Sequence, residues 1–341
     1  MRRLNRSINI ETSVKRIKAL ALLSGGLDST LAVKLILDQG IEVEALNFWT
    51  PFCLCGRGGC GAFEVAKNFS VPIKVMKLDK EYLQILKKPK YGYGKNMNPC
   101  IDCRILMLKK AKKHAREIGA SFIFTGEVLN ERPMSQHLKA LKTIEKEVNL
   151  VDKILRPLSA KLLPPTIMEK KGLVDREKLG SIHGRSRKKQ IKMATEFSIM
   201  NYPCPAGGCL LTYKEFARKV RDLFDHKKRV TMEDVSLLKV GRHFRLGKNK
   251  IIVGRNETEN KFLLRTKSKN DYYFEAQNTG SPITILQGPK TRKAIEKAAN
   301  LTAFYSDKKG DVFVKFGRTI LDKSIISPKQ EPLEVEKLRI T

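Results

Sequence analysis

Residues 18–29 read KALALLSGGLDS, an apolar run that leads into a Ser-Gly-Gly turn. Residues 29–38 follow with apolar side chains at helical spacing. This order predicts a strand, a glycine turn and a helix. In such a turn the backbone N–H groups and the helix dipole converge on one point, which suits a phosphate group. A tight turn that binds no ligand is the alternative.

Further β-like runs at residues 41–48, 72–78 and 121–125 alternate with helical patterns at 61–69 and 105–118. Such alternation predicts a parallel sheet with helices on both faces. Ligands of these sheets bind beyond the carboxyl ends of the strands, where the glycine turn falls. The pattern therefore predicts an α/β fold class and also the position of a site.

The amino-acid composition of the rest of the chain changes at two points, near residues 156 and 239. Residues 156–189 are rich in proline and charge, which predicts an extended connection with short helices. From about residue 239, short β-like pieces precede a helix at 290–305 and a strand at 311–316, which predicts a small α+β domain. The expected division is a basic N-terminal segment (1–17), an α/β domain (18–155), its extension (156–235), the α+β domain (236–330) and a tail (331–341).

The charge of the chain is strongly positive. Its 341 residues include 67 Lys and Arg against 35 Asp and Glu, a formal net charge of +32. Small soluble domains carry net charges of about 2–8, so the surplus favours a polyanionic partner, nucleic acid first. A lysine-rich surface of the thermophile kind is the alternative, but acids are scarce here. No stretch reaches the ~20 apolar residues of a membrane span, and we expect a cytoplasmic protein.

A dense basic run at residues 184–189 opens an expected helix. Arginine and lysine at this density suit phosphate contacts, although a solvated helix face is the alternative. The residues expected to contact RNA in this run are Arg185, Arg187, Lys188 and Lys189.

The cysteines form three groups, and their CxC and CxxC spacings fit metal ligation or sulfur chemistry better than a disulfide framework. The CxxC and CxxxxC pairs together make a fair zinc pattern, and inert buried thiols are a second alternative. The glycine-rich first group could form a second metal site, relay sulfur, or be a loop with reduced thiols. The groups are Cys53, Cys55 and Cys60; Cys100 and Cys103; and Cys204 and Cys209.

The glycine turn at 24–29 resembles the pyrophosphate loop of the ATP pyrophosphatases (PP-loop, HUP-like fold). This resemblance implies that ATP binds with Mg²⁺, is cleaved between its α and β phosphates and adenylates a carbonyl oxygen. Asp28 would hold the magnesium ion. Thr125-Gly126-Glu127 resembles a segment of tRNA 4-thiouridine synthetases that lies near ATP. The expected nucleotide-binding residues are Ser24, Gly25, Gly26, Asp28, Ser29, Phe48, Gly126 and Glu127.

Residues 98–103 (NPCIDC) resemble a cysteine segment of tRNA-specific 2-thiouridylases, and residues 205–212 resemble their distal cysteine motif. The resemblance implies that Asp28, Cys103 and Cys209 are catalytic. In relatives with this arrangement, three cysteines ligate a [4Fe–4S] cluster with one open iron; here they would be Cys100, Cys103 and Cys209. Zinc, or a cluster-free route in which one cysteine carries a persulfide and another resolves it, stays open.

Residues 241–318 resemble the NFACT-R RNA-binding domain, most clearly at Val253-Gly254-Arg255-Asn256. The resemblance implies RNA contact by this domain, with Arg255 among the contacts. The aromatic run at 272–274 could stack on bases, but alternating aromatics on a strand are more often half core.

Taken together, these features predict an ATP-dependent tRNA sulfurtransferase. A uridine carbonyl oxygen would attack the α phosphate of ATP, and sulfur held on the open iron of the [4Fe–4S] cluster would then displace AMP. Inorganic sulfide or a persulfide carrier would supply that sulfur. Two alternatives stay open. One is another PP-loop enzyme acting on RNA, by amide ligation or by removal of sulfur. The other is an RNA-binding protein that uses the loop only to sense nucleotides.

Overall fold

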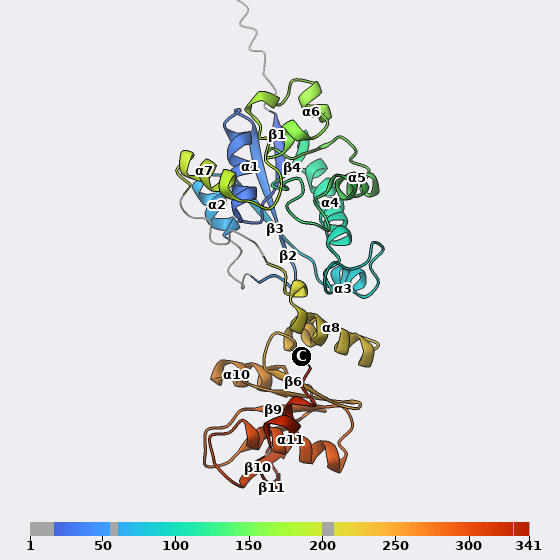
Figure 1. Ribbon diagram of the computed structural model, residues 1–341, viewed down its shortest axis with the longest axis vertical. Coiled ribbons are helices and arrows are strands. Elements are labelled where there is room, and N and C mark those ends of the chain that lie inside the picture. The colour runs from blue at the N-terminus through green and yellow to red at the C-terminus, as the bar shows by residue number, and fades with distance from the viewer. Residues whose placement is uncertain (1–16, 55–60, 200–207, 330, 341) are drawn as a thin grey trace, which may run out of the picture. The chain divides into compact units, whose positions relative to one another are not determined.

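The computed structural model describes residues 17–54, 61–199, 208–329 and 331–340 (Figure 1). The chain divides into two compact units, and neither is continuous in sequence. The first unit comprises Met1–Trp49, Cys55–Lys77 and Cys100–Gly207, and the second comprises Thr50–Leu54, Leu78–Pro99 and Gly208–Thr341.

The first unit is built on a parallel sheet with the strand order β3-β2-β1-β4-β5. β1 lies at the centre, where Ala19 is opposite Val43 on one side and Phe122 on the other. The glycine turn therefore follows the central strand, as the sequence pattern predicts. The strands are β1 (Lys18–Leu22), β2 (Glu42–Trp49), β3 (Ile73–Lys77), β4 (Phe122–Thr125) and β5 (Ile154–Leu155).

Helices cover both faces of this sheet. α1 and α2 share a core with one face, whereas α4 packs on β1 and β4 and against α5 on the other (Figure 1). This arrangement confirms the predicted α/β class. The helices are α1 (Leu27–Leu37), α2 (Ala62–Asn68), α4 (Cys100–Glu117), α5 (Leu138–Glu147), α6 (Ile167–Lys170) and α7 (Lys188–Glu196), with 3-10 turns at Ala160–Leu162 and Arg176–Lys178.

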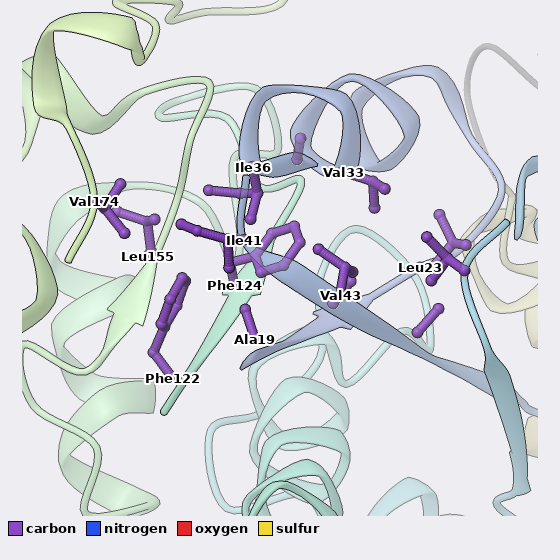
Figure 2. Packing of buried hydrophobic residues seen from close by; sticks show 14 of the residues in the cluster. Ala19, Leu23, Val33, Ile36, Ile41, Val43, Phe122, Phe124, Leu155 and Val174 are labelled. Atoms are coloured by element: carbon purple, nitrogen blue, oxygen red, sulfur yellow. The ribbon is translucent and has the colours of Figure 1, made fainter. Parts of the chain in front are cut away.

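The core of the first unit lies between the sheet and α1 (Figure 2). Ala19, Val43 and Phe124 come from three neighbouring strands, and Val33 and Ile36 come from α1. β1 is buried along nearly its whole length, which is normal for the central strand of a parallel sheet covered on both faces. The rigid centre of the unit is therefore directly below the glycine turn.

The second unit contains an antiparallel sheet in the order β11-β10-β8-β9-β7-β6. Helix α11 (Arg292–Phe304) packs on one face, and α10 (Glu257–Thr266) contributes Leu263 to the core on the other. This is the predicted α+β domain. Its strands are β6 (Arg242–Leu246), β7 (Asn249–Val253), β8 (Tyr272–Ala276), β9 (Thr284–Gln287), β10 (Val312–Gly317) and β11 (Lys323–Ser327).

Two segments of this unit differ from the sequence expectation. Residues 257–266, included among the β-like pieces, form α10, because the Asn256 side chain accepts a hydrogen bond from Glu259 N and caps the helix. Residues of the expected tail pack on the sheet: Arg245 N donates to Leu338 O, and Val335 is fully buried. The other helices are α3 (Lys80–Lys87), α8 (Lys214–His226), α9 (Met232–Leu237) and α12 (Pro332–Glu336), with a 3-10 turn at Leu210–Thr212.

Candidate functional site

The glycine turn joins β1 to α1 through two glycines with different roles. Gly25 has a φ of 78°, a left-handed conformation that favours glycine. Gly26 is the N-cap of α1, and its carbonyl accepts a hydrogen bond from Thr30 N at 3.1 Å. The first N–H groups of α1 therefore face the carboxyl end of the sheet, where an anion is favoured.

Two hydroxyls flank the turn, as predicted. Ser29 Oγ donates to Gly26 O at 2.9 Å and lies 3.1 Å from Ser24 Oγ. Gly26 N in turn donates to Ser24 Oγ at 3.4 Å. Both hydroxyls are thus held at the mouth of the turn, within reach of a phosphate bound there.

Gly126 follows β4 and touches the first turn of α1. A Cβ at this position would lie 2.5 Å from both Cα and N of Ser29, and both of these are backbone atoms. No side chain fits there without a backbone shift. The structure therefore brings the predicted Gly126 and Ser29 together, and it explains the glycine by close backbone approach.

Glu127 is the centre of a buried ion-pair network. One carboxylate oxygen accepts from Arg156 Nε and from Thr125 Oγ1, each at 3.2 Å, and the other lies 3.3 Å from Arg104 Nε. Burial opposes its ionisation, but Arg104 and Arg156 outweigh that effect and hold the pKa of Glu127 below its ordinary value. Glu127 is therefore ionised and ties α4 to the end of the sheet.

Asp28 lies in the first turn of α1 beside two charged groups. Its Oδ2 is 3.7 Å from Arg187 Nη2, and the same arginine nitrogen is 2.6 Å from a Glu131 oxygen. Burial and the negative charge of Glu131 raise the pKa of Asp28 to about 6, although Arg187 opposes the shift. Its buried Oδ1 has no hydrogen-bond partner among the described residues. A hard cation such as Mg²⁺ fits this carboxylate.

These groups line one pocket at the carboxyl ends of β1 and β4. Seven lining residues are missing from the predicted nucleotide set, and among the described residues neither Gly25 nor Phe48 belongs to the lining. Arg187, predicted for RNA, enters because α7 packs against α1. The lining is Leu22, Ser24, Gly26, Asp28, Ser29, Arg104, Thr125, Gly126, Glu127, Glu131, Arg132, Gln136 and Arg187.

Cys100 and Cys103 belong to the first turn of α4. Their segment was expected to precede the helix, so this is a correction. Cys100 lies one helical turn before Arg104, whose side chain lines the pocket and reaches Glu127. Neither Cys100 nor Cys103 is itself among the residues that line the pocket.

Two further cysteines of the predicted groups, Cys53 and Cys209, belong to the second unit. In the second unit Cys53 is the antiparallel bridge partner of Cys209. None of the cysteines in the described part of the chain is in a disulfide. Over the same residues, no three His, Cys, Asp or Glu side chains are grouped to hold a metal ion. Cys55, Cys60 and Cys204 lie outside the described residues.

In the second unit the aromatic run on β8 belongs to the core. Tyr272 and Phe274 are buried and pack on Phe316, with ring centroids 5.8 and 5.1 Å away. They are therefore core residues and not platforms for bases. Arg255, the predicted RNA contact, is paired with Glu259, its Nε lying 2.9 Å from Oε1.

Three cations surround the Tyr272 ring. Lys290 Nζ, the Arg318 guanidinium carbon and Lys323 Nζ lie 5.5, 5.6 and 5.5 Å from its centroid. Within the described residues none of the three forms an ion pair with a carboxylate, and Arg318 and Lys323 are exposed. We call these three residues the Tyr272 cation cluster.

The first unit is an α/β unit with a glycine turn and a pocket at the carboxyl end of its central strand, and the second unit is a separate domain built on an antiparallel sheet. Residues 15–161 match the family described as thiamine biosynthesis protein (ThiI), and residues 241–338 match the NFACT protein RNA binding domain. Both matches confirm the resemblances predicted from the sequence. No helix in the described ranges is long and apolar enough to span a membrane.

Individual relatives agree with these matches. A probable tRNA sulfurtransferase of Lysinibacillus sphaericus (strain C3-41) is 34% identical over 145 residues, 41% of this chain and 34% of that protein. The tRNA-specific 2-thiouridylase MnmA of Syntrophotalea carbinolica is 33% identical over 117 residues, 31% of this chain and 33% of that protein. The chain thus spans about a third of the length of these relatives. A solved 4-thiouridine synthetase–RNA complex with bound ATP is 25% identical, covers 65% of this chain and 52% of that one, and has a TM-score of 0.35.

Proposed function

We propose that the protein is an ATP-dependent tRNA sulfurtransferase that acts on a uridine carbonyl in the cytoplasm. The observation that carries the proposal is the position of two thiols. Cys100 and Cys103 belong to the start of α4, and the next residue, Arg104, lines the pocket of the glycine turn. A phosphate site with adjacent thiols is what adenylation followed by sulfur transfer requires. The names of the relatives, tRNA sulfurtransferase and tRNA-specific 2-thiouridylase, support the same reaction.

In the first step the pocket holds ATP. The N–H groups at the start of α1 and the hydroxyls of Ser24 and Ser29 face the β and γ phosphates, which leave together as pyrophosphate. Asp28 would hold Mg²⁺, which would neutralise phosphate charge. Arg104 and Arg132 line the same pocket and add positive charge where negative charge develops.

The second step uses the enzyme-bound base. The uridine carbonyl oxygen attacks the α phosphate, which converts a poor leaving group into AMP on the base. A stacked target base must first be flipped into the pocket, and the pocket then supplies orientation. Sulfur from inorganic sulfide or a persulfide carrier replaces AMP, with the thiol of Cys103 next to the reacting carbon.

We derive no step through a [4Fe–4S] cluster, for which the proposed ligands are Cys100, Cys103 and Cys209. The cluster stays a proposal of its own, as does zinc. Iron, zinc and acid-labile sulfide contents of anaerobically purified protein, before and after replacement of these cysteines, test it directly.

RNA contact rests on charge. The Tyr272 cation cluster collects three positive groups in the second unit, and none of them is ion-paired within the described residues. Phosphate oxygens are the natural partners for such a set. In the first unit Arg185, Lys188 and Lys189 are exposed and stay proposed contacts. Arg187 faces Asp28 and Glu131, so we assign it to the nucleotide pocket.

The test separates catalysis from binding. Asp28→Ala and Cys103→Ala should each abolish thiolation of tRNA while tRNA binding persists, because neither side chain belongs to the proposed RNA surface. Thiolated nucleosides are measured by mass spectrometry and tRNA binding by filter retention. Continued turnover in either variant would overturn the role given to that residue. Pyrophosphate release that needs no sulfur source would favour the alternative PP-loop reactions.

A further inference from the structure

Cys53 and Cys209 are held opposite each other in the second unit. Leu54 N donates to Gly208 O at 3.1 Å, and Leu210 N donates to Phe52 O at 2.8 Å. These two hydrogen bonds flank the cysteines and do not join them. The cysteines therefore form a non-hydrogen-bonded antiparallel pair, in which both side chains lie on one face and the Cα atoms are about 4.5 Å apart.

This geometry suits a disulfide. A disulfide requires Cα atoms about 4.4–6.8 Å apart and Cβ atoms that face each other. A non-hydrogen-bonded pair meets both conditions without movement of the backbone. Both cysteines are half-buried, and they are not joined in the present structure. Their thiols can therefore exchange between a reduced and an oxidised form.

The pairing is fixed by packed groups on both segments. Phe52 is fully buried, with its ring centroid 5.6 Å from Tyr82 and 6.0 Å from Phe216. On the other segment Leu211 is fully buried. Next to the pair, Gly208 lies against the side chain of Leu54, so the two segments are in contact on this side as well. The cysteine pair is therefore a consequence of the core next to it.

We propose that Cys53 resolves a persulfide on Cys209. The proposal rests on the sulfur transfer proposed above and adds a thiol that the sequence resemblance leaves out. Cys100 and Cys103 belong to the other unit, whereas Cys53 and Cys209 are fixed by the same backbone pairing. The sequence analysis assigns Cys53 and Cys209 to different groups, because no local sequence pattern predicts that two residues so far apart in the chain pair with each other.

The chemistry is a thiol–persulfide exchange. A persulfide carrier first loads one sulfur atom on Cys209. Cys53 Sγ then attacks Cys209 Sγ, the bond to the outer sulfur breaks, and that sulfur leaves with the electron pair as hydrosulfide. The Cys53 sulfur is oxidised, the outer sulfur is reduced, and the Cys53 proton passes to water. A dithiol reductant returns the resulting Cys53–Cys209 disulfide to two thiols.

The experiment uses the full chain, reduced, desalted without oxygen and treated with glutathione persulfide. Non-reduced tryptic peptides are assigned by fragmentation mass spectrometry, and released sulfide is measured. A Cys55→Ser/Cys204→Ser background leaves a single cysteine in each of the two peptides concerned. We expect the Cys53–Cys209 disulfide together with released sulfide. In Cys53→Ser we expect both to be lost and the persulfide to remain on Cys209. Cys100→Ser is the matched control and should leave the disulfide unchanged.

A disulfide from Cys209 to Cys100 or Cys103, or no disulfide with Cys209, would overturn the proposal. Fragmentation of native peptides gives the same assignment if the background variant does not fold. The assay contains neither ATP nor tRNA, so it is independent of the proposed function. A chain that forms this disulfide but never thiolates tRNA would refute sulfur transfer to RNA and leave the cysteine pair standing.

Discussion

Asp28 is the pocket residue whose pKa is raised most clearly by its surroundings. It is buried beside Glu131 and Arg187, and its pKa of about 6 lies well above the ordinary 3.8. A carboxyl group with this pKa is partly protonated in weak acid, and a bound Mg²⁺ must displace that proton. The site is therefore sensitive to pH in a range where ordinary carboxylates are not.

We predict that the affinity for Mg²⁺–ATP falls as the pH drops below about 6, by about tenfold per unit, because one proton competes with the metal. Without nucleotide, the folded chain holds this proton more tightly than the unfolded chain, so this group lowers the free energy of unfolding as the pH rises from 3.8 to about 6. Calorimetric titration at several pH values measures the affinity. An unchanged pH profile in Asp28→Asn would show that another group is responsible.

Gly126 is the residue where a single methyl group should matter most. In Gly126→Ala the new Cβ would meet backbone atoms of Ser29, and overpacking of this kind costs about 1–3 kcal/mol. We expect loss of stability and of ATP binding together, because the clash falls on the glycine turn. Denaturant unfolding and nucleotide titration measure both.

Gly119→Ala is the matched control. A Cβ at Gly119 meets nothing within 4 Å, although its φ of 66° adds a backbone cost. We expect it to lose some stability and to keep ATP binding. Equal nucleotide affinities in Gly126→Ala and in the unmodified chain would contradict the close approach of Gly126 to Ser29 as the reason for the glycine.

The residues of the pocket divide into those that sequence could find and those that it could not. Ser24, Asp28 and Gly126 stand in short motifs, so spacing alone marks them. Arg187 reaches the pocket because α7 packs on α1, a long-range contact without a local pattern, and there it pairs with Glu131 from the segment after β4. The sequence predicts RNA contact for Arg187 because it stands in a run of basic residues at 184–189.

At the scale of elements, Glu127 joins the end of β4 to α4 and to the segment after β5. Within the described part of the chain, removing the charge in Glu127→Gln leaves the buried Arg156 with Glu145 as its one remaining ion-pair partner. We expect a loss of about 3 kcal/mol in the free energy of unfolding, since breaking one side of a buried ion pair costs ~3–5 kcal/mol.

Chemical unfolding followed by circular dichroism measures this change. Lys161→Ala, which removes an exposed pair with Glu177, is the control and should change stability by less than about 1 kcal/mol. Equal losses in the two variants would mean that the Glu127 network does not hold the elements together.

Helix boundaries explain a second set of differences between sequence and structure. Apolar spacing marks α4 only from Ile105, yet the helix begins at Cys100, and this moves both cysteines into its first turn. At 257–266 the polar first turn hides α10 among strand-like residues. The parallel strands were predictable because their apolar runs are continuous, as burial on both faces requires.

At the scale of the whole molecule, the positive charge should act through particular residues. Replacing Lys290, Arg318 and Lys323 by alanine should weaken tRNA binding across all sequences. It should also lower the slope of log affinity against log salt, by ~0.7–0.9 for each phosphate that the variant no longer neutralises. Fluorescence anisotropy with labelled tRNA over a salt series measures both.

The control removes the same charge elsewhere on the second unit. Lys261, Arg292 and Lys337 each pair with a glutamate on their own helix, so their replacement should change the slope little. Identical slopes for the two triple variants would mean that net charge alone, and not the Tyr272 cation cluster, governs binding.

The division of the chain could not be predicted. The amino-acid composition along the chain predicts domains that are continuous in sequence, with limits near residues 156 and 236. In the folded chain, residues 50–54 and 78–99 belong to the same compact unit as the residues after 208. Such grouping depends on pairings like Cys53 with Cys209, which no local pattern encodes. The same long-range pairing creates the thiol pair proposed above.

The most direct test of ATP-dependent tRNA thiolation is pyrophosphate release by the purified chain with ATP, Mg²⁺, tRNA and a sulfur source, coupled to mass spectrometry of the tRNA nucleosides. We predict a thiolated uridine formed together with pyrophosphate, and neither product when tRNA is omitted or Asp28 is replaced. Pyrophosphate without a thiolated nucleoside, or no turnover under anaerobic conditions with both sulfur sources, would contradict the proposed function.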